Sequence, residues 1–315
     1  MGSRVLVTRR LPAAPVARLA AAHVVDLHAG STPLPAEELH ERLDGAAGVV
    51  VLLPDRMDRQ AIDAAGASLK VIANVAVGYD NLDVDYARSK GIVCTNTPDV
   101  LTEATADLTW ALILGITRRL GEGERLVRAN QWKGWSFDFM LGTGLQGKLL
   151  GIVGGGRIGR AVARRAEAFG MQVAVHSRRD PGWPGAEWVP LDRLIRTADV
   201  LSLHVPMTPE TRHLIDKTAI TRMKRSAYLI NTTRGPVVDE AGLAWALGQH
   251  LIAGAALDVF EREPEVHPGL LGLENVLLVP HLGSATRETR VAMADLAVDN
   301  VLAVLSGRPA ITPIG

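Results

Sequence analysis

Short apolar runs alternate along this chain with longer amphipathic stretches. The apolar runs are rich in Val, Ile and Leu, and Pro, Gly or charged segments separate them, which predicts strands. Strands that alternate with helical stretches are typical of a parallel sheet with crossover helices. The predicted strands fall into two series: 4–7, 24–27, 49–53, 71–74 and 92–95, then 149–153, 172–175, 200–204, 227–231, 252–257 and 276–279.

Two long helical patterns lie outside this alternation. The first runs over residues 101–120 and follows Pro98 and Asp99, which are typical of a helix start. The second spans residues 290–305, where apolar side chains recur at roughly helical spacing and predict an amphipathic helix. The Trp-Pro-Gly sequence at 183–185 predicts a surface connection.

Composition limits the class of protein. A chain of 315 residues with 47 % hydrophobic content can build two domains, each with its own core. The formal charge is zero, which removes the usual electrostatic case for nucleic acid or an anionic membrane as a partner. The single Cys94 allows neither an internal disulfide nor a cysteine-based zinc site, and no metal is expected. With no apolar run long enough for a bilayer and no secretory h-region, we expect a cytoplasmic protein.

A glycine-rich motif, GIVGGGRIG, starts the second series at Gly151. Gly154, Gly156 and Gly159 have the G-x-G-x-x-G spacing, after a predicted strand and before a helical pattern. A bare glycine triplet is equally compatible with a flexible turn. In this context the motif predicts a dinucleotide site, with the pyrophosphate at the helix N-terminus. The backbone of the whole loop is expected to contribute: Gly154, Gly155, Gly156, Arg157, Ile158 and Gly159.

The end of the second cofactor strand bears on which dinucleotide is bound. An NAD site usually carries an acidic residue there, about 20 residues after the glycines. This chain has Ser177, Arg178 and Arg179 instead, whose hydroxyl and guanidinium groups suit a 2'-phosphate. The alternative is two solvated arginines on a loop, with Asp180 weakening their field. We expect NADP to be preferred, with NAD possible.

A series of motifs in fixed order carries a resemblance to a known family. The motifs are NVAVGYDNLDV, TPDVLTEATADLTWALIL, GIVGGGRIG, HVPMTPETRHLID, LINTTRGPVVDEAGLAWAL, GAALDVFEREP and VPHLGSAT, from about Asn74 to Thr286. Together they resemble the D-isomer-specific 2-hydroxyacid dehydrogenases. The VLVTRRLP segment and the SRR sequence are most similar to the glyoxylate and hydroxypyruvate reductase branch.

The resemblance implies three catalytic residues. His281 matches the family's proton donor, Glu263 the carboxylate that pairs with it, and Arg234 the substrate-binding arginine. Taken singly, each also fits a structural role in a loop or turn. Glu261 lies two residues before Glu263, but the position directly before Pro264 favours Glu263. The resemblance also implies that the substrate carboxylate binds the backbone of Val77 and Gly78, next to Asn74, as well as Arg234 and His281.

Further cofactor contacts follow from the same residue-by-residue match. Asp258 is expected to accept a hydrogen bond from the nicotinamide carboxamide, although a turn cap is the alternative for this residue. His204, His213 and His250 are read as cofactor-wall or surface residues. The remaining expected contacts are Thr105, His204, Val205, Pro206, Thr211, Thr232, Thr233, Arg234, His281 and Gly283.

The resemblance implies two Rossmann-like α/β domains. A doubly wound parallel-sheet cofactor domain is expected over 98–285, and a smaller flavodoxin-like substrate domain over 1–97 with 286–315. It also implies a homodimer formed through 101–145, where Phe139 replaces a tryptophan often found in this branch.

The expected reaction is the NAD(P)H-dependent reduction of a small 2-oxo acid. Glyoxylate or hydroxypyruvate would give glycolate or D-glycerate, with the proton from His281. Alternatives are 3-phosphoglycerate, D-lactate or phosphite as the substrate, and a cofactor-sensing protein like the corepressors of this fold. Formate is disfavoured, because formate dehydrogenases carry glutamine where this chain has Glu263. The sequence leaves open which 2-oxo acid is used, in which direction, and how strict the cofactor preference is.

Overall fold

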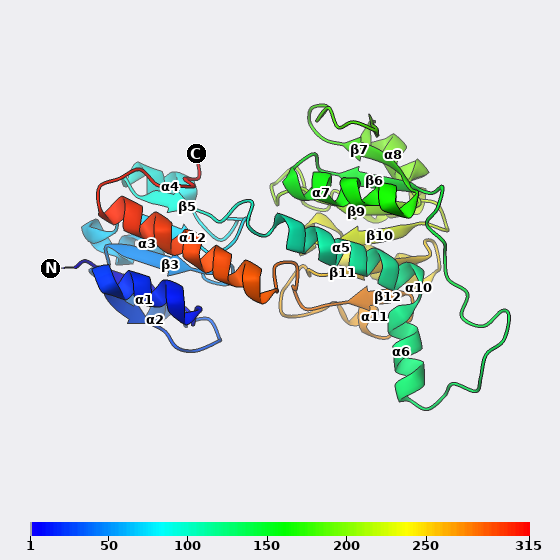
Figure 1. Ribbon diagram of the computed structural model, residues 1–315, viewed down its shortest axis with the longest axis horizontal. Helices are drawn as coiled ribbons and strands as arrows, with labels where there is room; N and C mark the ends of the chain where they lie inside the picture. The colour runs from blue at the N-terminus through cyan, green and yellow to red at the C-terminus, as the bar shows by residue number, and fades with distance from the viewer. Residues whose placement is uncertain (1) are drawn as a thin grey trace. The chain divides into compact units, whose positions relative to one another are not determined.

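The computed structural model describes residues 2–315, which divide into two compact units (Figure 1). Unit 1 contains the chain up to Leu101 together with Ala285–Gly315, and unit 2 contains Thr102–Ser284. Both ends of the chain therefore belong to unit 1. None of the helices described over residues 2–315 is both long and apolar enough to cross a membrane.

Unit 1 is a five-stranded parallel sheet covered by helices on both faces. The strand order β2-β1-β3-β4-β5 is the flavodoxin-like order. Helices α1 and α12 pack together on one face, and α2, α3 and α4 cover the other with a core of aliphatic side chains. The elements are β1 (Arg4–Val7), α1 (Ala13–Ala22), β2 (Val24–Leu27), α2 (Ala36–Leu43), β3 (Gly48–Val51), α3 (Arg59–Ala64), η1 (Gly66–Ser68), β4 (Val71–Asn74), α4 (Val84–Ser89), β5 (Val93–Thr95) and α12 (Arg287–Leu305).

Unit 2 is a seven-stranded parallel sheet in the order β12-β11-β10-β9-β6-β7-β8. Its order reverses between β6 and β9, as in doubly wound dinucleotide-binding sheets. The elements are α5 (Thr102–Thr117), α6 (Leu120–Arg128), β6 (Leu149–Val153), α7 (Arg157–Ala166), η2 (Glu167–Phe169), β7 (Gln172–His176), β8 (Ala186–Trp188), α8 (Leu191–Thr197), β9 (Val200–Leu203), α9 (Lys217–Arg222), β10 (Tyr228–Asn231), η3 (Gly235–Val237), α10 (Glu240–Gly248), β11 (Gly254–Leu257), α11 (Pro268–Leu271) and β12 (Val276–Leu278).

The central strands of unit 2 are buried on both faces. Every residue of β9, β10 and β11 is buried, so these strands are mostly apolar along their length rather than alternating, with Ser202 and Asn231 as their polar residues. Two separate apolar clusters result, one under α5 and α7 and the other under α8, α9, α10 and α11. The predicted fold class, two parallel-sheet α/β domains, is confirmed.

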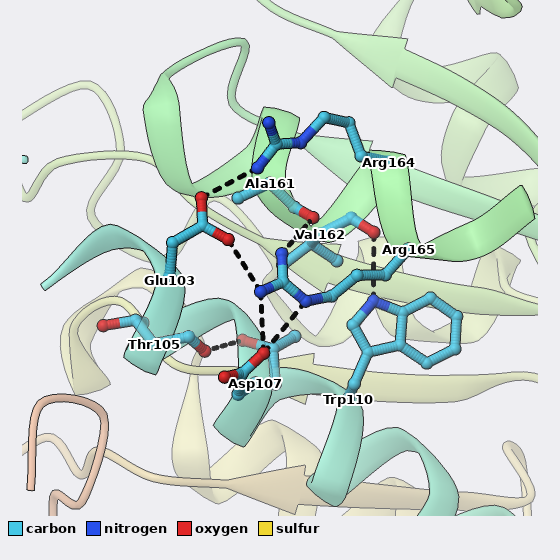
Figure 2. A network of polar contacts seen from close by, with 9 residues as sticks. Glu103, Thr105, Asp107, Trp110, Ala161, Val162, Arg164 and Arg165 are labelled. Carbon is cyan, nitrogen blue, oxygen red and sulfur yellow. Dashed lines mark hydrogen bonds and ion pairs between the residues drawn. The ribbon is translucent and has the colours of Figure 1, made fainter. Parts of the chain in front are cut away.

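Helices α5 and α7 are fastened to each other by polar contacts (Figure 2). Arg165 of α7 bonds Glu103 and Asp107 of α5, each at 2.7 Å from Nη2. The hydrogen bond from Arg165 is the main cause that lowers the pKa of Glu103. The Trp110 indole donates to the carbonyl of Val162 at 3.0 Å. These contacts fix α7, whose N-terminus follows the glycine loop, against the helix that carries Thr105.

The segment predicted as one helix over 101–120 is divided in the structure. Helix α5 ends at Thr117, and Arg119 adopts a left-handed conformation with φ of +53° before α6 begins. The Thr117 hydroxyl donates to the Ile113 carbonyl at 2.7 Å within the last turn of α5. The apolar periodicity of the sequence continues past Thr117, so the periodicity alone does not predict where α5 ends.

The segment around 183–185 is the surface connection that the sequence predicts, a turn between β7 and β8 in which Pro184 and Gly185 are exposed, but its tryptophan is only partly on the surface. Trp183 is half-buried and packs against the apolar cluster under α5 and α7. A side chain at Gly159 would meet the Trp183 ring at 3.4 Å. Immediately after it, β8 adds an edge strand to β7. A large aromatic residue gains more from burial than a loop position suggests.

Candidate functional site

The glycine loop lies where the strand order of unit 2 reverses. Gly154 has a φ of +116°, and a Cβ there would stand 2.3 Å from the His204 carbonyl oxygen, which follows β9. A Cβ at Gly159 would stand 2.3 Å from the Gly154 oxygen. Gly154 therefore permits the tight turn, and Gly159 permits close contact between α7 and the loop. At both positions the structure leaves no space for a side chain.

Gly156 is different, because a Cβ there would meet nothing within 4 Å. Its backbone is extended, with φ of −82°, so neither strain nor packing in the protein demands glycine. The residue is the N-cap of α7, a helix of 10 residues whose first N–H groups point out of its end. Space above backbone N–H groups at a helix N-terminus is what a dinucleotide pyrophosphate requires. The loop fits a nicotinamide dinucleotide on this observation.

The three residues after β7 lie on the surface of unit 2. Arg178 and Arg179 are exposed, and the Ser177 hydroxyl donates to the Arg179 carbonyl at 2.5 Å. A Cβ at Gly155 would stand 2.8 Å from that hydroxyl, so Ser177 borders the glycine loop. Asp180 accepts from the Gly182 N–H at 2.9 Å. The turn is thus built by Ser177 and Asp180, and the two guanidinium groups face solvent beside the loop.

The segment after β9 is held in a compact turn. Thr211 donates to the Pro206 carbonyl at 2.7 Å and accepts from the Thr208 N–H at 2.8 Å. The Thr233 hydroxyl donates to the Val205 carbonyl. His204 is half-buried, its Nε2 lies 2.9 Å from the Ser202 hydroxyl, and burial lowers its pKa, so the ring is neutral near pH 7. A neutral imidazole is compatible with its predicted place beside a cofactor.

A chain of buried threonines joins α5 to the ends of two other segments. The Thr105 hydroxyl donates to the Gly283 carbonyl at 3.1 Å, and Thr109 and Thr232 share a hydrogen bond of 3.1 Å. All three threonines are under 10 % exposed. The sequence interpretation named Thr105 and Thr232 but missed Thr109. The signal was present, because Thr105 and Thr109 are four residues apart on one helix face.

Glu263 and His281 meet directly in unit 2. His281 Nδ1 lies 2.8 Å from Glu263 Oε2, and Glu263 Oε1 accepts from the Phe260 N–H at 3.1 Å. Burial tends to raise the pKa of Glu263, but the hydrogen bond and charge of His281 outweigh it and hold this pKa below its ordinary value. The carboxylate is therefore charged near neutral pH. With Nδ1 occupied by Glu263, His281 keeps Nε2 for another partner.

Asp258 fixes the segment that carries His281. Its two carboxylate oxygens accept from the N–H groups of Leu282 and Gly283, the latter at 2.9 Å, and its carbonyl accepts from the His281 N–H at 2.9 Å. His281 has a φ of +54°, so these bonds maintain an uncommon conformation. Burial raises the pKa of Asp258 against the opposing backbone bonds. The contact of Asp258 with a carboxamide stays a prediction, since a carboxylate has further acceptor capacity.

Arg234 follows β10 and is positioned by its neighbours. The Asn231 side chain donates to the Arg234 carbonyl at 3.0 Å and accepts from the Thr233 N–H at 3.1 Å. The Arg234 guanidinium donates to the Thr233 carbonyl at 2.8 Å. Asn231 was not singled out from the sequence, although it lies within the NTTRG motif that identified Arg234.

The remaining predicted substrate residues belong to unit 1. Asn74, at the end of β4, is fully buried, and its amide donates to the Gly78 carbonyl at 2.8 Å. Asn96 donates to the Val77 carbonyl at 2.8 Å. Both hydrogen bonds fix carbonyl oxygens of the loop that follows β4. Asn74 therefore shapes the loop, and its contact with substrate stays a prediction.

Over residues 2–315, no group of three or more His, Cys, Asp or Glu side chains is arranged to hold a metal ion. Cys94 is buried, and burial raises the pKa of its thiol to about 11. A thiol of this kind does not ionise near neutral pH.

Comparison with known proteins agrees with this geometry. Residues 110–283 match the family model described as D-isomer specific 2-hydroxyacid dehydrogenase, NAD binding domain. The chain is 44 % identical to the glyoxylate reductase of Thermococcus litoralis, over 98 % of this chain and 95 % of that protein.

Two solved structures show the same architecture. A protein from Thermus thermophilus is similar with a TM-score of 0.94 and 47 % identity, over 99 % of this chain and all of that one. The NADPH-dependent glyoxylate/hydroxypyruvate reductase of Sinorhizobium meliloti, in complex with NADP and malonate, is similar with a TM-score of 0.89 and 37 % identity. That likeness covers all of this chain and 97 % of the other.

Proposed function

Because this chain belongs to the D-isomer specific 2-hydroxyacid dehydrogenase family and is an NAD(P)-dependent oxidoreductase, we propose that it reduces glyoxylate or hydroxypyruvate. The products would be glycolate and D-glycerate. The observation that carries the proposal is the Glu263–His281 contact of 2.8 Å in the same unit as Arg234 and the glycine loop. The names of the similar reductases support the choice of these two substrates among 2-oxo acids.

Reduction of a 2-oxo acid needs a hydride on the carbonyl carbon and a proton on the oxygen. The nicotinamide supplies the hydride when bound. His281 donates the proton from Nε2, and Glu263 holds the ring through Nδ1. Arg234 offers a planar fork to the substrate carboxylate and polarises the carbonyl. For unit 1, we propose that the backbone N–H groups of Val77 and Gly78 bind substrate. Unit 1 would serve the substrate, and unit 2 the cofactor.

NADPH is the preferred hydride donor in this proposal. Arg178 and Arg179 support it, since both are exposed beside the glycine loop, and they stand where an acidic residue would otherwise bind the ribose 2'-hydroxyl. The double variant Arg178→Ala/Arg179→Ala should raise the Kd for NADPH about tenfold or more and leave that for NADH nearly unchanged, because paired arginines bind phosphate strongly. A wild-type preference for NADH of about tenfold would contradict this choice.

An exposed apolar segment supports a homodimer. Trp132, Trp135, Phe137 and Leu141 are all more than half exposed in the single chain, and Leu120 of α6 is 60 % exposed. Apolar side chains gathered in one segment are typical of an interface with another protein. Phe139, at 41 % exposed, lies in the same segment. Light scattering should give twice the chain mass, and a monomeric mass would contradict a dimer.

A turnover assay tests the proposed function. NADPH oxidation is followed with glyoxylate, hydroxypyruvate, pyruvate and phenylpyruvate. Activity should be highest with glyoxylate or hydroxypyruvate, and His281→Ala should lower kcat by about 10²- to 10⁴-fold, the usual contribution of a general acid. NADPH affinity of this variant should stay nearly unchanged. Absence of turnover with all four acids would instead favour a cofactor-sensing protein.

A further inference from the structure

Two residues outside the proposed catalytic set, His213 and Glu261, contact each other. His213 Nε2 lies 3.1 Å from Glu261 Oε1. The same oxygen accepts from the Glu240 N–H, the first of α10, at 2.9 Å. The Glu261 side chain is 19 % exposed and that of His213 36 % exposed, so the pair is largely shielded. The two residues are 48 positions apart in the sequence: His213 lies after β9, and Glu261 lies after β11.

His213 also touches a third segment through its backbone. Its N–H donates to the Pro236 carbonyl at 2.7 Å. Three loops are therefore involved, which we name the cofactor-side loop (205–213), the arginine loop (234–237) and the glutamate loop (260–263). The first carries Thr211, the second Arg234 and the third Glu263.

The arginine loop and the glutamate loop are also in direct backbone contact. A Cβ at Gly235 would stand 1.8 Å from the Phe260 carbonyl carbon and 2.4 Å from the Glu261 nitrogen. Only glycine permits so close an approach. The position of Glu263 relative to Arg234 therefore depends on how the Phe260–Glu261 backbone seats on Gly235. The Glu261 side chain also holds that backbone in place, because its carboxylate accepts from the Glu240 N–H of α10.

We propose that His213 and Glu261 are a pair of positioning residues that set the glutamate loop against the arginine loop, so that Glu263 holds His281 while Arg234 faces the same substrate. This inference rests on the proposed function and adds two residues to it. Neither residue touches a reacting atom. They act through Glu263: Glu261 fastens the loop to α10, and His213 links that anchor to the segment beside the cofactor.

The conformation of His213 makes a clean substitution available. Its φ of +49° lies in the left-handed region, where glycine is more favourable than histidine. His213→Gly therefore removes the side chain with a gain in backbone freedom to adopt this turn. His250 has a φ of +51°, lies exposed after α10, and contacts none of the three loops in the bonds described. His250→Gly is thus a matched control.

The experiment compares five variants of the full-length enzyme: His213→Gly, Glu261→Ala, their double variant, Glu261→Gln and His250→Gly. We expect His213→Gly and Glu261→Ala each to lower kcat about tenfold, since small displacements of catalytic groups cost up to about 10² in rate. KM for the 2-oxo acid and Kd for NADPH should change less than about threefold. Glu261→Gln keeps the acceptor oxygen and should stay near wild type, like His250→Gly.

The double variant tests whether the two residues act together. If they do, it should lose no more than the larger single variant, because the second substitution removes a contact already lost. Independent, multiplicative losses would overturn the pairing. Wild-type kcat in both single variants would overturn the positioning role. If Glu261→Ala fails to fold, His213→Gly measured against His250→Gly decides the same question.

A second readout does not depend on turnover. The pKa of the Glu263 carboxyl is held low through His281 and can be followed by carbon-13 NMR of labelled glutamate. Displacing Glu263 should raise this pKa in Glu261→Ala and His213→Gly, and leave it unchanged in His250→Gly. An unchanged Glu263 pKa in all variants would count against positioning. If the wild type reduces no 2-oxo acid, the proposed function fails while this titration still decides the inference.

Discussion

The two units have the same kind of topological switch point, where the strand order of a parallel sheet reverses, but the loops at that point differ. In unit 2 the reversal lies between β6 and β9, and glycines occupy the loop after β6, with open space beside Gly156. In unit 1 it lies between β1 and β3, and the loops there are joined by a buried ion pair between Arg9 and Asp55. Ligands of open α/β sheets bind at such points.

At the switch point of unit 1, the ion pair joins the loops that follow β1 and β3. Arg9 Nη2 lies 2.6 Å from Asp55 Oδ1, while Asp55 Oδ2 accepts from Thr8 at 2.5 Å and from the Leu52 N–H at 2.9 Å. Arg9 and Asp55 are 7 % and 3 % exposed. The loop predicted to bind substrate follows β4, one strand further along. The same topology thus leaves open space beside the loop backbone in unit 2, where side chains are missing, and gives a fixed set of side-chain contacts in unit 1.

The largest effect is expected from breaking this ion pair. Asp55→Ala leaves a buried guanidinium without its carboxylate, and should lower the free energy of unfolding by about 3–5 kcal/mol. Urea denaturation at pH 7 measures it. The double variant Arg9→Met/Asp55→Leu removes both charges and should recover at least half of the loss. An equal loss of unfolding free energy in the single and double variants would show that the packing of these side chains matters rather than their charges.

A smaller effect, on binding rather than folding, is expected in unit 2. Gly156→Ala places a methyl group where the pyrophosphate is expected, and should weaken NADPH binding about tenfold, or roughly 1.4 kcal/mol. Its stability should change by less than about 1 kcal/mol, because Ala restricts the unfolded chain and fits the extended backbone but is a poorer N-cap than glycine. Fluorescence titration and thermal unfolding measure the two effects.

Gly154→Ala is the matched control for this prediction. There the methyl group collides with the His204 carbonyl and the φ of +116° is unfavourable for alanine, so stability should fall. Undiminished NADPH binding by Gly156→Ala would mean that the open space in the loop is not the phosphate site.

Local patterns predicted most of the fold. Buried strands such as β4 and β6 have the predicted limits, because a short apolar run is a local feature of the sequence. The strand predicted over 49–53 ends at Val51, since the Leu52 N–H turns to the Asp55 carboxylate. The edge strand β8 was missed, because a half-exposed strand of three residues has no such pattern.

The candidate site was predicted from sequence motifs, so only residues within those motifs were assigned to it. Glu263 and His281, which the resemblance to the family pairs, lie in contact at 2.8 Å, and their catalytic role stays a prediction. The His213–Glu261 contact was missed because nothing local marks residues 48 apart as partners. Asp258 was assigned to the cofactor, whereas its visible contacts are with the backbone of the His281 segment. A carboxylate after a strand suits both uses, and the cofactor contact of Asp258 stays a prediction.

The smallest change in stability is expected at Asp26, an aspartate of unit 1 that is ion-paired like Asp55 but more exposed to solvent. Its carboxylate bonds Arg42 and also Arg4, the latter at 2.7 Å, and its side chain is 28 % exposed. The hydrogen bond from Arg42 is the main cause that lowers the pKa of Asp26. Because solvent screens such pairs, Asp26→Asn should cost less than about 1 kcal/mol at pH 7.

The pH dependence of that loss follows from the sign of the shift. A pKa that is lower in the folded than in the unfolded chain adds stability above the unfolded value, about 3.9 for Asp, and this stability disappears as the pH falls through the folded value. The difference between wild type and Asp26→Asn in urea unfolding should therefore be constant from pH 7 to 5 and shrink below about pH 4. Asp85→Asn, at a side chain 95 % exposed, should show almost no difference at any pH. If the difference for Asp26→Asn persists undiminished at the lowest pH, its cause is lost hydrogen-bond geometry rather than lost charge. Asp26 would then have the same kind of structural role as Asp55.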